Sequence, residues 1–152
     1  LTNNVIIGRQ NIKKYKSNLA TVKIKNAIKE SESVISLFDV KTPNTNTLAT
    51  ALSGGNQQKF VVGRELEDDP SLLIASQPTR GIDIGAQSLI WEKLRESRDN
   101  GLAVLLISAD LEELIGLSDR IIVFYQGSMV KELNSANLSP EDLGGYMTGL
   151  KK

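Results

Sequence analysis

The chain has 152 residues, no net formal charge, no cysteine and no histidine. This length is enough for one globular domain with its own core. The absence of cysteine and histidine excludes disulfide frameworks, zinc sites with thiolate or imidazole ligands, and every histidine base. Balanced charge argues against a nucleic-acid binder held by phosphate contacts, so we expect no nucleic-acid partner. The longest apolar runs fall far short of the ~20 residues of a membrane-spanning helix, and we expect neither such a helix nor a secretory leader.

The first 29 residues contain basic but no acidic side chains. We interpret this stretch as a solvated basic helical face, and a surface near anionic lipid or an acidic partner is the alternative. Apolar residues at steps of three and four predict a helix over about residues 21–38. A shorter helix over residues 3–11 is a weaker prediction, and residues 15–20 are predicted as a loop. The basic residues are Arg9, Lys13, Lys14, Lys16, Lys23, Lys25 and Lys29.

The later part of the chain has an α/β pattern. Short apolar runs at residues 72–75 and 103–107 predict buried strands, and a helical pattern at 87–99 joins them. A strand, a helix and a strand in this order predict parallel strands. The other predicted elements are a helix at 57–66, a helix at 110–117 capped by Asp110, strands at 120–125 and 128–133 around Gln126-Gly127, and a helix starting at Ser139-Pro140.

Residues 52–59, which read LSGGNQQK, form the most informative stretch. Two glycines allow a tight turn and a close approach of backbone to a ligand. The free N–H groups of the predicted helix and the hydroxyl of Ser53 suit a phosphate. On these residues alone, an ordinary Ser-Gly-Gly cap of a helix is the simpler interpretation.

In its context, however, this stretch resembles the signature motif of ABC-type ATPases, in the form found in simple-sugar and nucleoside importers. The sequence PTRGIDIGA at residues 78–86 resembles the end of the family's Walker B strand and its D-loop. The resemblance covers the chain from Leu48 onward. It implies an α/β fold, a partial P-loop ATPase domain with a mainly parallel sheet and flanking helices. Residues 1–50 would form part of the helical subdomain, and residues 51–152 would carry the signature and the C-terminal part of the core.

Two departures from the family pattern limit what this chain is expected to do. No GxxxxGK[ST] phosphate loop occurs, so the chain resembles the later part of a second nucleotide-binding domain, and we expect a fragment of a longer protein. Ser76 and Gln77 replace the Walker B Asp-Glu, and Ala109 replaces the switch histidine. In the family, these acidic residues help to hold Mg²⁺ and polarise the attacking water. We therefore predict no intact catalytic residue, no metal site and no useful ATP hydrolysis at this chain's own site.

The resemblance leaves intact the surface that the family offers to a partner domain. It implies that two domains face head to tail and that each presents its signature to the other's ATP. The residues implied to bind ATP in this way are Ser53, Gly54, Gly55, Asn56 and Gln57, with Asp83 as the D-loop contact. A plain helix-capping aspartate is the alternative for Asp83. The implied cofactors, in the assembled protein, are ATP and Mg²⁺.

These expectations lead to an ATP-binding subunit of an importer at the cytoplasmic face of the membrane. Its partners would be the other nucleotide-binding half, the permease subunits and, indirectly, a solute-binding protein. The sequences around Gln77 and Ala109 resemble the nucleoside branch, so we place nucleoside import ahead of simple-sugar import. The parent protein would hydrolyse ATP, while the isolated chain would be inactive. A non-hydrolysing interaction module and a soluble ABC-type protein acting on ribosomes or DNA are the alternatives.

The missing strand that leads into the phosphate loop has a structural consequence. In the family that strand is central in the sheet. Without it, the edges of the predicted strands at 103–107 and 120–125 would be unpaired. We therefore expect a homodimer of the fragment or an exchange of strands between chains.

Overall fold

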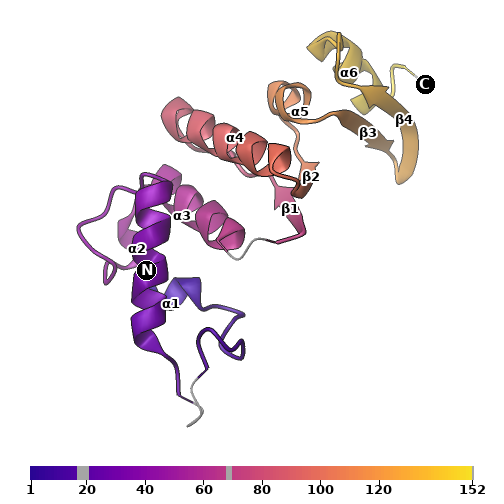
Figure 1. The fold of residues 1–152 in the computed structure, drawn as a ribbon. Helices are drawn as coiled ribbons and strands as arrows, with labels where there is room; N and C mark the ends of the chain where they lie inside the picture. Colours follow the sequence, from indigo (N-terminus) through magenta and orange to yellow (C-terminus); the bar gives the residue numbers. More distant parts are fainter. Residues whose placement is uncertain (17–20, 68–69, 152) are drawn as a thin grey trace. The chain divides into compact units, whose positions relative to one another are not determined.

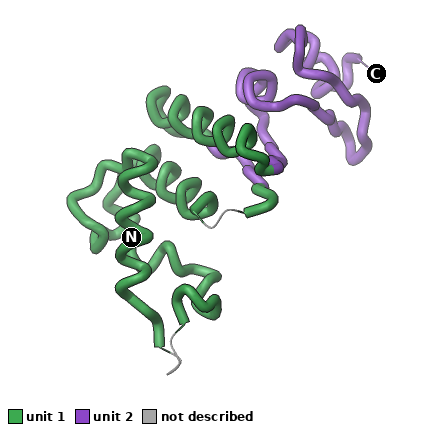
Figure 2. The backbone as a smooth tube through the Cα atoms, in the orientation of Figure 1, with its two compact units in different colours: residues 1–73, 79–102 green, residues 74–78, 103–152 purple. Residues whose placement is uncertain are grey.

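The computed structural model describes residues 1–16, 21–67 and 70–151, and Figure 1 shows the order of the elements. Two compact units are present (Figure 2). The first comprises Leu1–Leu73 and Thr79–Leu102, and the second comprises Ile74–Pro78 and Ala103–Lys152. The elements are α1 (Thr2–Val5), α2 (Ile24–Leu37), the 3₁₀ helix η1 (Ala49–Ala51), α3 (Gly54–Leu66), β1 (Leu72–Ser76), α4 (Ile84–Asp99), β2 (Ala103–Ile107), α5 (Leu111–Leu117), β3 (Arg120–Tyr125), β4 (Ser128–Asn134) and α6 (Pro140–Met147).

The N-terminal segment is less helical than the sequence predicts. Helix α1 ends at Val5, and most of residues 6–15 lie in turns. Gly8 has a φ of +79°, a left-handed conformation that no α-helix contains. The prediction of a helix through residue 11 was therefore wrong. Of the predicted loop at 15–20, residues 17–20 lie outside the described part of the chain.

Helix α2 forms within a few residues of its predicted bounds and packs against α3. Its buried stripe includes Ala27 and Val34, both with no exposed surface. The contact with α3 is close at Gly63, where an added Cβ would lie 2.6 Å from Cδ2 of Phe38 and 2.8 Å from Cγ1 of Val34. A glycine is therefore needed at this crossing because any side chain would overlap α2.

The strands confirm the predicted α/β fold. Strands β1 and β2 pair in parallel, with α4 as the connection between them. Strands β3 and β4 form an antiparallel hairpin. At its tip, Gln126 and Gly127 have φ values of +48° and +77°, as a two-residue hairpin turn of type I′ requires.

The second unit has a small core of its own. Its buried members are Leu114, Ile121, Val123 and Leu143, contributed by α5, β3 and α6. Alternate residues of β3 point into this core, which is the period of a half-buried strand. No helix in the described part of the chain is both long and apolar enough to cross a membrane.

Candidate functional site

The signature stretch forms the first turn of α3. Ser53 is the N-cap, and its hydroxyl oxygen accepts a hydrogen bond from the backbone N–H of Asn56 at 3.4 Å. The helix begins at Gly54, three residues before the predicted start at Gln57. Gly54 and Gly55 are therefore helical, and the expected tight glycine turn was wrong. Ser53 and Gly54 are exposed at this end of the helix, while Gly55 is buried.

Gly55 is a glycine because a second helix lies against it. An added Cβ would lie 2.9 Å from Oδ2 of Asp83 and 3.0 Å from the Cβ of Ala86, at the start of α4. At Gly54, by contrast, the nearest atom to an added Cβ is the carbonyl oxygen of Gly81 at 3.9 Å. The two neighbouring glycines thus have different roles: Gly55 permits contact between helices, and Gly54 leaves the outer surface of the turn open.

Asp83 lies at this contact and caps α4. Its Oδ1 accepts a hydrogen bond from the backbone N–H of Ala86 at 2.9 Å. This hydrogen bond is the main reason why the pKa of Asp83 is lowered, and the positive charge of Lys59 acts in the same direction. The carboxylate is exposed, so it also faces outward beside Gly55. The helix-capping interpretation of Asp83 therefore accounts for its geometry, and its predicted D-loop role remains a prediction.

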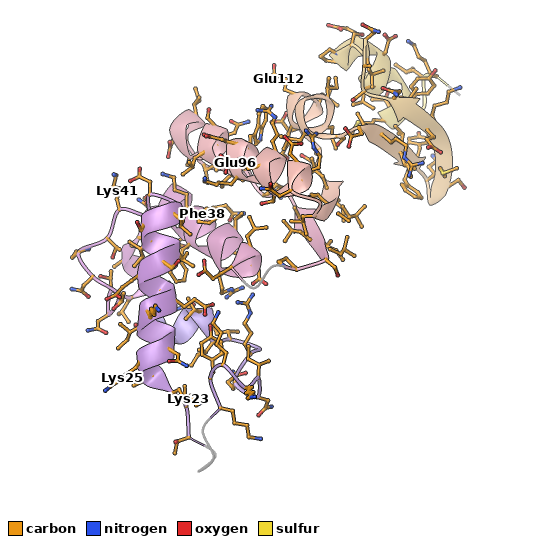
Figure 3. The ribbon with its side chains drawn as sticks, viewed as in Figure 1. Lys23, Lys25, Phe38, Lys41, Glu96 and Glu112 are labelled. Carbon is orange, nitrogen blue, oxygen red and sulfur yellow. The ribbon has the colours of Figure 1, made fainter. Side chains whose placement is uncertain are left out.

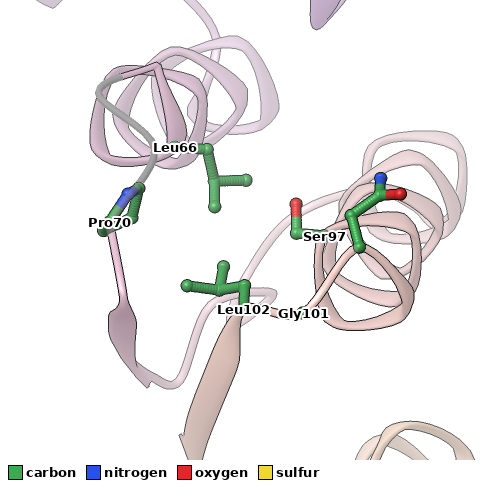
Figure 4. Close-up of a pocket in the computed structure, with 6 residues that line it drawn as sticks. Leu66, Pro70, Ser97, Gly101 and Leu102 are labelled. Atoms are coloured by element: carbon green, nitrogen blue, oxygen red, sulfur yellow. The ribbon is translucent and has the colours of Figure 1, made fainter.

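Helices α3 and α4 run in the same direction. Their N-terminal ends meet at Gly55 and Asp83, and near their C-terminal ends Leu66 and Ser97 line a common pocket of about 350 Å³ (Figure 4). Both helix dipoles therefore place their positive ends at the signature turn, which favours an anion there. Among the residues that the structure describes, none that lines the pocket at the opposite ends is charged. Its other lining residues are Pro70, Asn100, Gly101 and Leu102.

The side chains of Asn56 and Gln57 are bonded within the chain. Nε2 of Gln57 donates to the carbonyl oxygen of Leu52 at 2.9 Å. Nδ2 of Asn56 donates to Oγ of Ser53 at 2.9 Å, and its Oδ1 accepts from the backbone N–H of Lys41 at 2.8 Å. Sequence reasoning missed Lys41, because it lies 15 residues before Asn56 and no local pattern connects the two.

The second group of predicted residues gathers where β1 and β2 end. Ser76 is the last residue of β1, Gln77 follows it, and Ala109 lies two residues beyond β2. The backbone N–H of Gln77 donates to the carbonyl oxygen of Ile107 at 2.8 Å, which ties the two strand ends together. Because the strands are parallel neighbours, their carboxyl ends share one edge.

This strand edge does not fit a magnesium ion. Mg²⁺ prefers carboxylate oxygens, whereas Ser76 and Gln77 offer only neutral oxygens and Ala109 offers none. Across the described ranges, with 17–20 and 68–69 excepted, no cluster of three or more His, Cys, Asp or Glu could hold a metal ion. No step of a reaction is therefore assigned to a metal at this edge.

The chain is similar to curated import proteins. It is 50% identical over 121 residues to the guanosine import ATP-binding protein NupO of Bacillus subtilis (strain 168), covering 80% of the chain and 24% of that protein. For the glucose import ATP-binding protein TsgD13 of Haloferax volcanii, the identity is 46% over 121 residues, with 78% and 22% covered. For the ribose import ATP-binding protein RbsA of Clostridium tetani, it is 38% over 136 residues, with 90% and 27% covered. No protein-family model matches the chain.

Comparison with solved structures identifies the fold. An inward-facing putative metal-chelate type ABC transporter aligns over 97% of this chain and 58% of its own, with a TM-score of 0.76 and 17% identity. The ATP-binding cassette MJ0796, as a dimer bound to ADP and phosphate, aligns over 79% of this chain and 51% of its own, with a TM-score of 0.64 and 22% identity. The chain has the fold of part of an ABC-type ATP-binding cassette. This part of the cassette spans about a quarter of the length of the curated relatives named above.

Proposed function

We propose that this partial cassette belongs to the ATP-binding subunit of an importer and presents its signature turn to ATP held by a partner domain. The observation that carries the proposal is the exposed pair Ser53 and Gly54 at the positive ends of two helices. A hydroxyl group and backbone N–H groups at a helix N-terminus are suited to phosphate oxygens. The 50% identity to a guanosine import ATP-binding protein gives independent support.

The turn would bind phosphate but would not cleave it. Ser53 supplies a neutral hydroxyl donor, and Gly54 leaves room for the phosphate to approach the backbone. At the chain's own strand edge, Gln77 can hydrogen-bond a water molecule but cannot accept its proton. We therefore propose that the site containing Ser76, Gln77 and Ala109 is degenerate. Turnover in the assembled protein would then depend on the partner's ATP and Mg²⁺.

For the transported substrate, nucleosides come first and simple sugars second. Identity is 50% with the guanosine relative, against 46% and 38% with the glucose and ribose relatives. The difference in sequence identity is small, as expected if the permease and the solute-binding protein select the substrate. As the ATP-binding subunit of an importer, the protein would lie at the cytoplasmic face of the membrane as a peripheral subunit.

A non-hydrolysing interaction module remains the second candidate for the isolated chain. The uncharged strand edge at Ser76 and Gln77 favours it. It differs from the main proposal only in the activity of the parent protein. A soluble ABC-type protein acting on ribosomes or DNA is disfavoured by the zero net charge and by the import relatives.

Calorimetric titration of Mg·ATP tests the proposal directly. We expect no binding by the chain alone, and binding with turnover once it is assembled with the remainder of the protein and its partner domain. Ser53→Arg or Gly54→Asp should abolish this turnover, because both changes obstruct the phosphate position. Ser128→Arg, on the β3–β4 hairpin, is the matched control and should leave it intact. Tight binding by the isolated chain, or full turnover with Ser53→Arg, would overturn the proposal.

A further inference from the structure

The side chain of Asn56 connects the signature serine to a distant backbone group. Its Oδ1 accepts from the backbone N–H of Lys41 at 2.8 Å, and its Nδ2 donates to Oγ of Ser53 at 2.9 Å. Lys41 follows the C-terminal end of α2, as its label in Figure 3 shows. The amide thus spans from the segment after α2 to the exposed hydroxyl of the signature turn.

The direction of these hydrogen bonds follows from the chemistry of the groups. A backbone N–H can only donate, so the atom of Asn56 that faces Lys41 must be the oxygen. The amino group of the same amide then faces Ser53, and the serine oxygen must accept. The backbone N–H of Asn56 also approaches this oxygen, at 3.4 Å.

Among the residues that the structure describes, none accepts the hydroxyl proton of Ser53, which is therefore free for a ligand. A hydroxyl group has two acceptor lone pairs and one donor proton, and Asn56 supplies a donor to each lone pair. We propose that Asn56 is a positioning residue that holds the Ser53 hydroxyl as an outward donor to the phosphate. This inference rests on the proposed function, and it assigns Asn56 to orienting Ser53 rather than to contacting ATP.

An aspartate at position 56 separates this role from a role in folding. A carboxylate still accepts from Lys41, and at the third residue of α3 it favours the helix electrostatically. It has no N–H to offer Ser53, so the hydroxyl would turn inward and donate to the carboxylate. Asn56→Asp should therefore preserve or raise stability while it removes the outward donor. Asn56→Ala should lower stability but leave the hydroxyl free to rotate toward the phosphate.

The test is a double-mutant cycle on ATP turnover by the assembled protein. Asn56→Asp should lower kcat/KM for ATP by about 10–100-fold, since a hydrogen bond to a charged phosphate is lost. The loss should fall to about twofold or less in the Ser53→Ala background, because Asn56 acts through that hydroxyl. Asn56→Ala should cost less activity than Asn56→Asp, although it should have the lower thermal midpoint. Asn134→Asp is the matched charge control, because Oδ1 of Asn134 likewise accepts a hydrogen bond from a backbone N–H, that of Ala136.

Two results would overturn the inference. One is an unchanged kcat/KM for Asn56→Asp. The other is an equal loss in both Ser53 backgrounds, as direct contact with ATP or simple charge repulsion would produce. Failure of the proposed function is a separate outcome, in which Ser53→Arg itself leaves turnover intact.

Discussion

Gly55 shows how one residue at the site serves packing rather than backbone flexibility. The sequence predicts a tight turn at both glycines of the signature, but in the structure both lie in a regular helix. The requirement at Gly55 comes from the distances of 2.9 Å to Asp83 and 3.0 Å to Ala86 that any Cβ would have. Gly54 has no such neighbour, so the two positions make a natural pair for comparison.

Gly55→Ala should lower the free energy of unfolding by about 1–3 kcal/mol, because the added methyl group forces α3 and α4 apart. Gly54→Ala is the matched control and should be neutral or slightly stabilising, since alanine is the better helix former and has room. Urea unfolding of both variants checks this. Equal effects at the two positions would contradict the packing explanation.

Asp83 should give the stability of the chain a characteristic pH dependence. Its pKa is lowered in the folded state, chiefly by the hydrogen bond from the Ala86 N–H. The stabilisation by its charge is therefore present above the unfolded pKa of about 4 and is lost as the pH falls through the lower folded pKa. Between about pH 5 and pH 3, the wild-type chain should lose more stability than Asp83→Asn. Parallel pH curves from denaturant unfolding would contradict this.

At the scale of the elements, α2 is the support of the first unit. One side of it packs on α3 through Gly63, and another anchors the N-terminal segment. The anchor is Glu30, a buried carboxylate that pairs with Arg9 at 3.5 Å and Lys14 at 2.5 Å and accepts from the hydroxyl of Tyr15. Two of the seven basic residues, Arg9 and Lys14, thus form ion pairs with a buried carboxylate of α2. The prediction of a plain solvated helical face was wrong on this point.

The crossing of α2 and α3 predicts a large effect for a small substitution. Gly63→Ala should lower the free energy of unfolding by about 2 kcal/mol, because its methyl group would overlap Phe38 and Val34. Gly144→Ala, on α6, is the control, since its Cβ would meet only Cδ1 of Leu111 at 3.8 Å. Thermal or urea unfolding distinguishes the two. A neutral Gly63→Ala would show that the helices separate without cost.

Charge reversal on the N-terminal segment should have different effects on stability at the neighbouring residues Lys13 and Lys14. Lys14→Glu should cost on the order of 2 kcal/mol, because it places a second carboxylate beside the buried Glu30. Lys13→Glu is the matched control: its side chain is exposed, and we expect little change in stability. Urea unfolding measures both. If Lys13→Glu weakens assembly with the proposed permease subunits while stability is unchanged, the alternative of a basic surface for an acidic partner gains support; intact assembly counts against it.

At the scale of the whole molecule, the strands of the second unit have more apolar surface than the chain covers. Ile74, Leu105 and Ile107 are 61%, 51% and 49% exposed. Strands β1 and β2 are apolar at nearly every position, the pattern of parallel strands that are buried on both faces. One of those faces is exposed in the described part of the chain, which spans 51% and 58% of the two solved chains named above.

This bare face leads us to propose self-association of the isolated chain. Sedimentation velocity should show dimers or larger species whose population rises with concentration, because exposed apolar strands associate with those of other chains. Leu105→Lys should reduce the effect. Leu150→Lys, which changes an isolated leucine that is 86% exposed, is the control. A strictly monomeric chain at high concentration would contradict the proposal.

The sequence by itself determined the class and order of most elements. The strands over Ala103–Ile107 and Arg120–Tyr125 and the caps at Asp110 and Ser139 could be predicted because each depends on local periodicity or on a single capping residue. The signature-like stretch and the departure from the Walker B pattern could also be read from the sequence, since each motif is contiguous, and their roles remain predictions. The parallel pairing of β1 and β2 then brought Ser76, Gln77 and Ala109 together as the order of the elements implies.

Only the tertiary structure decided how the candidate site is held. The contact of Gly55 with Asp83, the bond from Lys41 to Asn56 and the burial of Glu30 join residues 15 to 28 positions apart. Local sequence patterns do not predict such contacts, because the contacts depend on where two packed elements meet. The sequence therefore predicts which groups a phosphate would contact, whereas the packing of α2, α3 and α4 fixes how those groups are oriented.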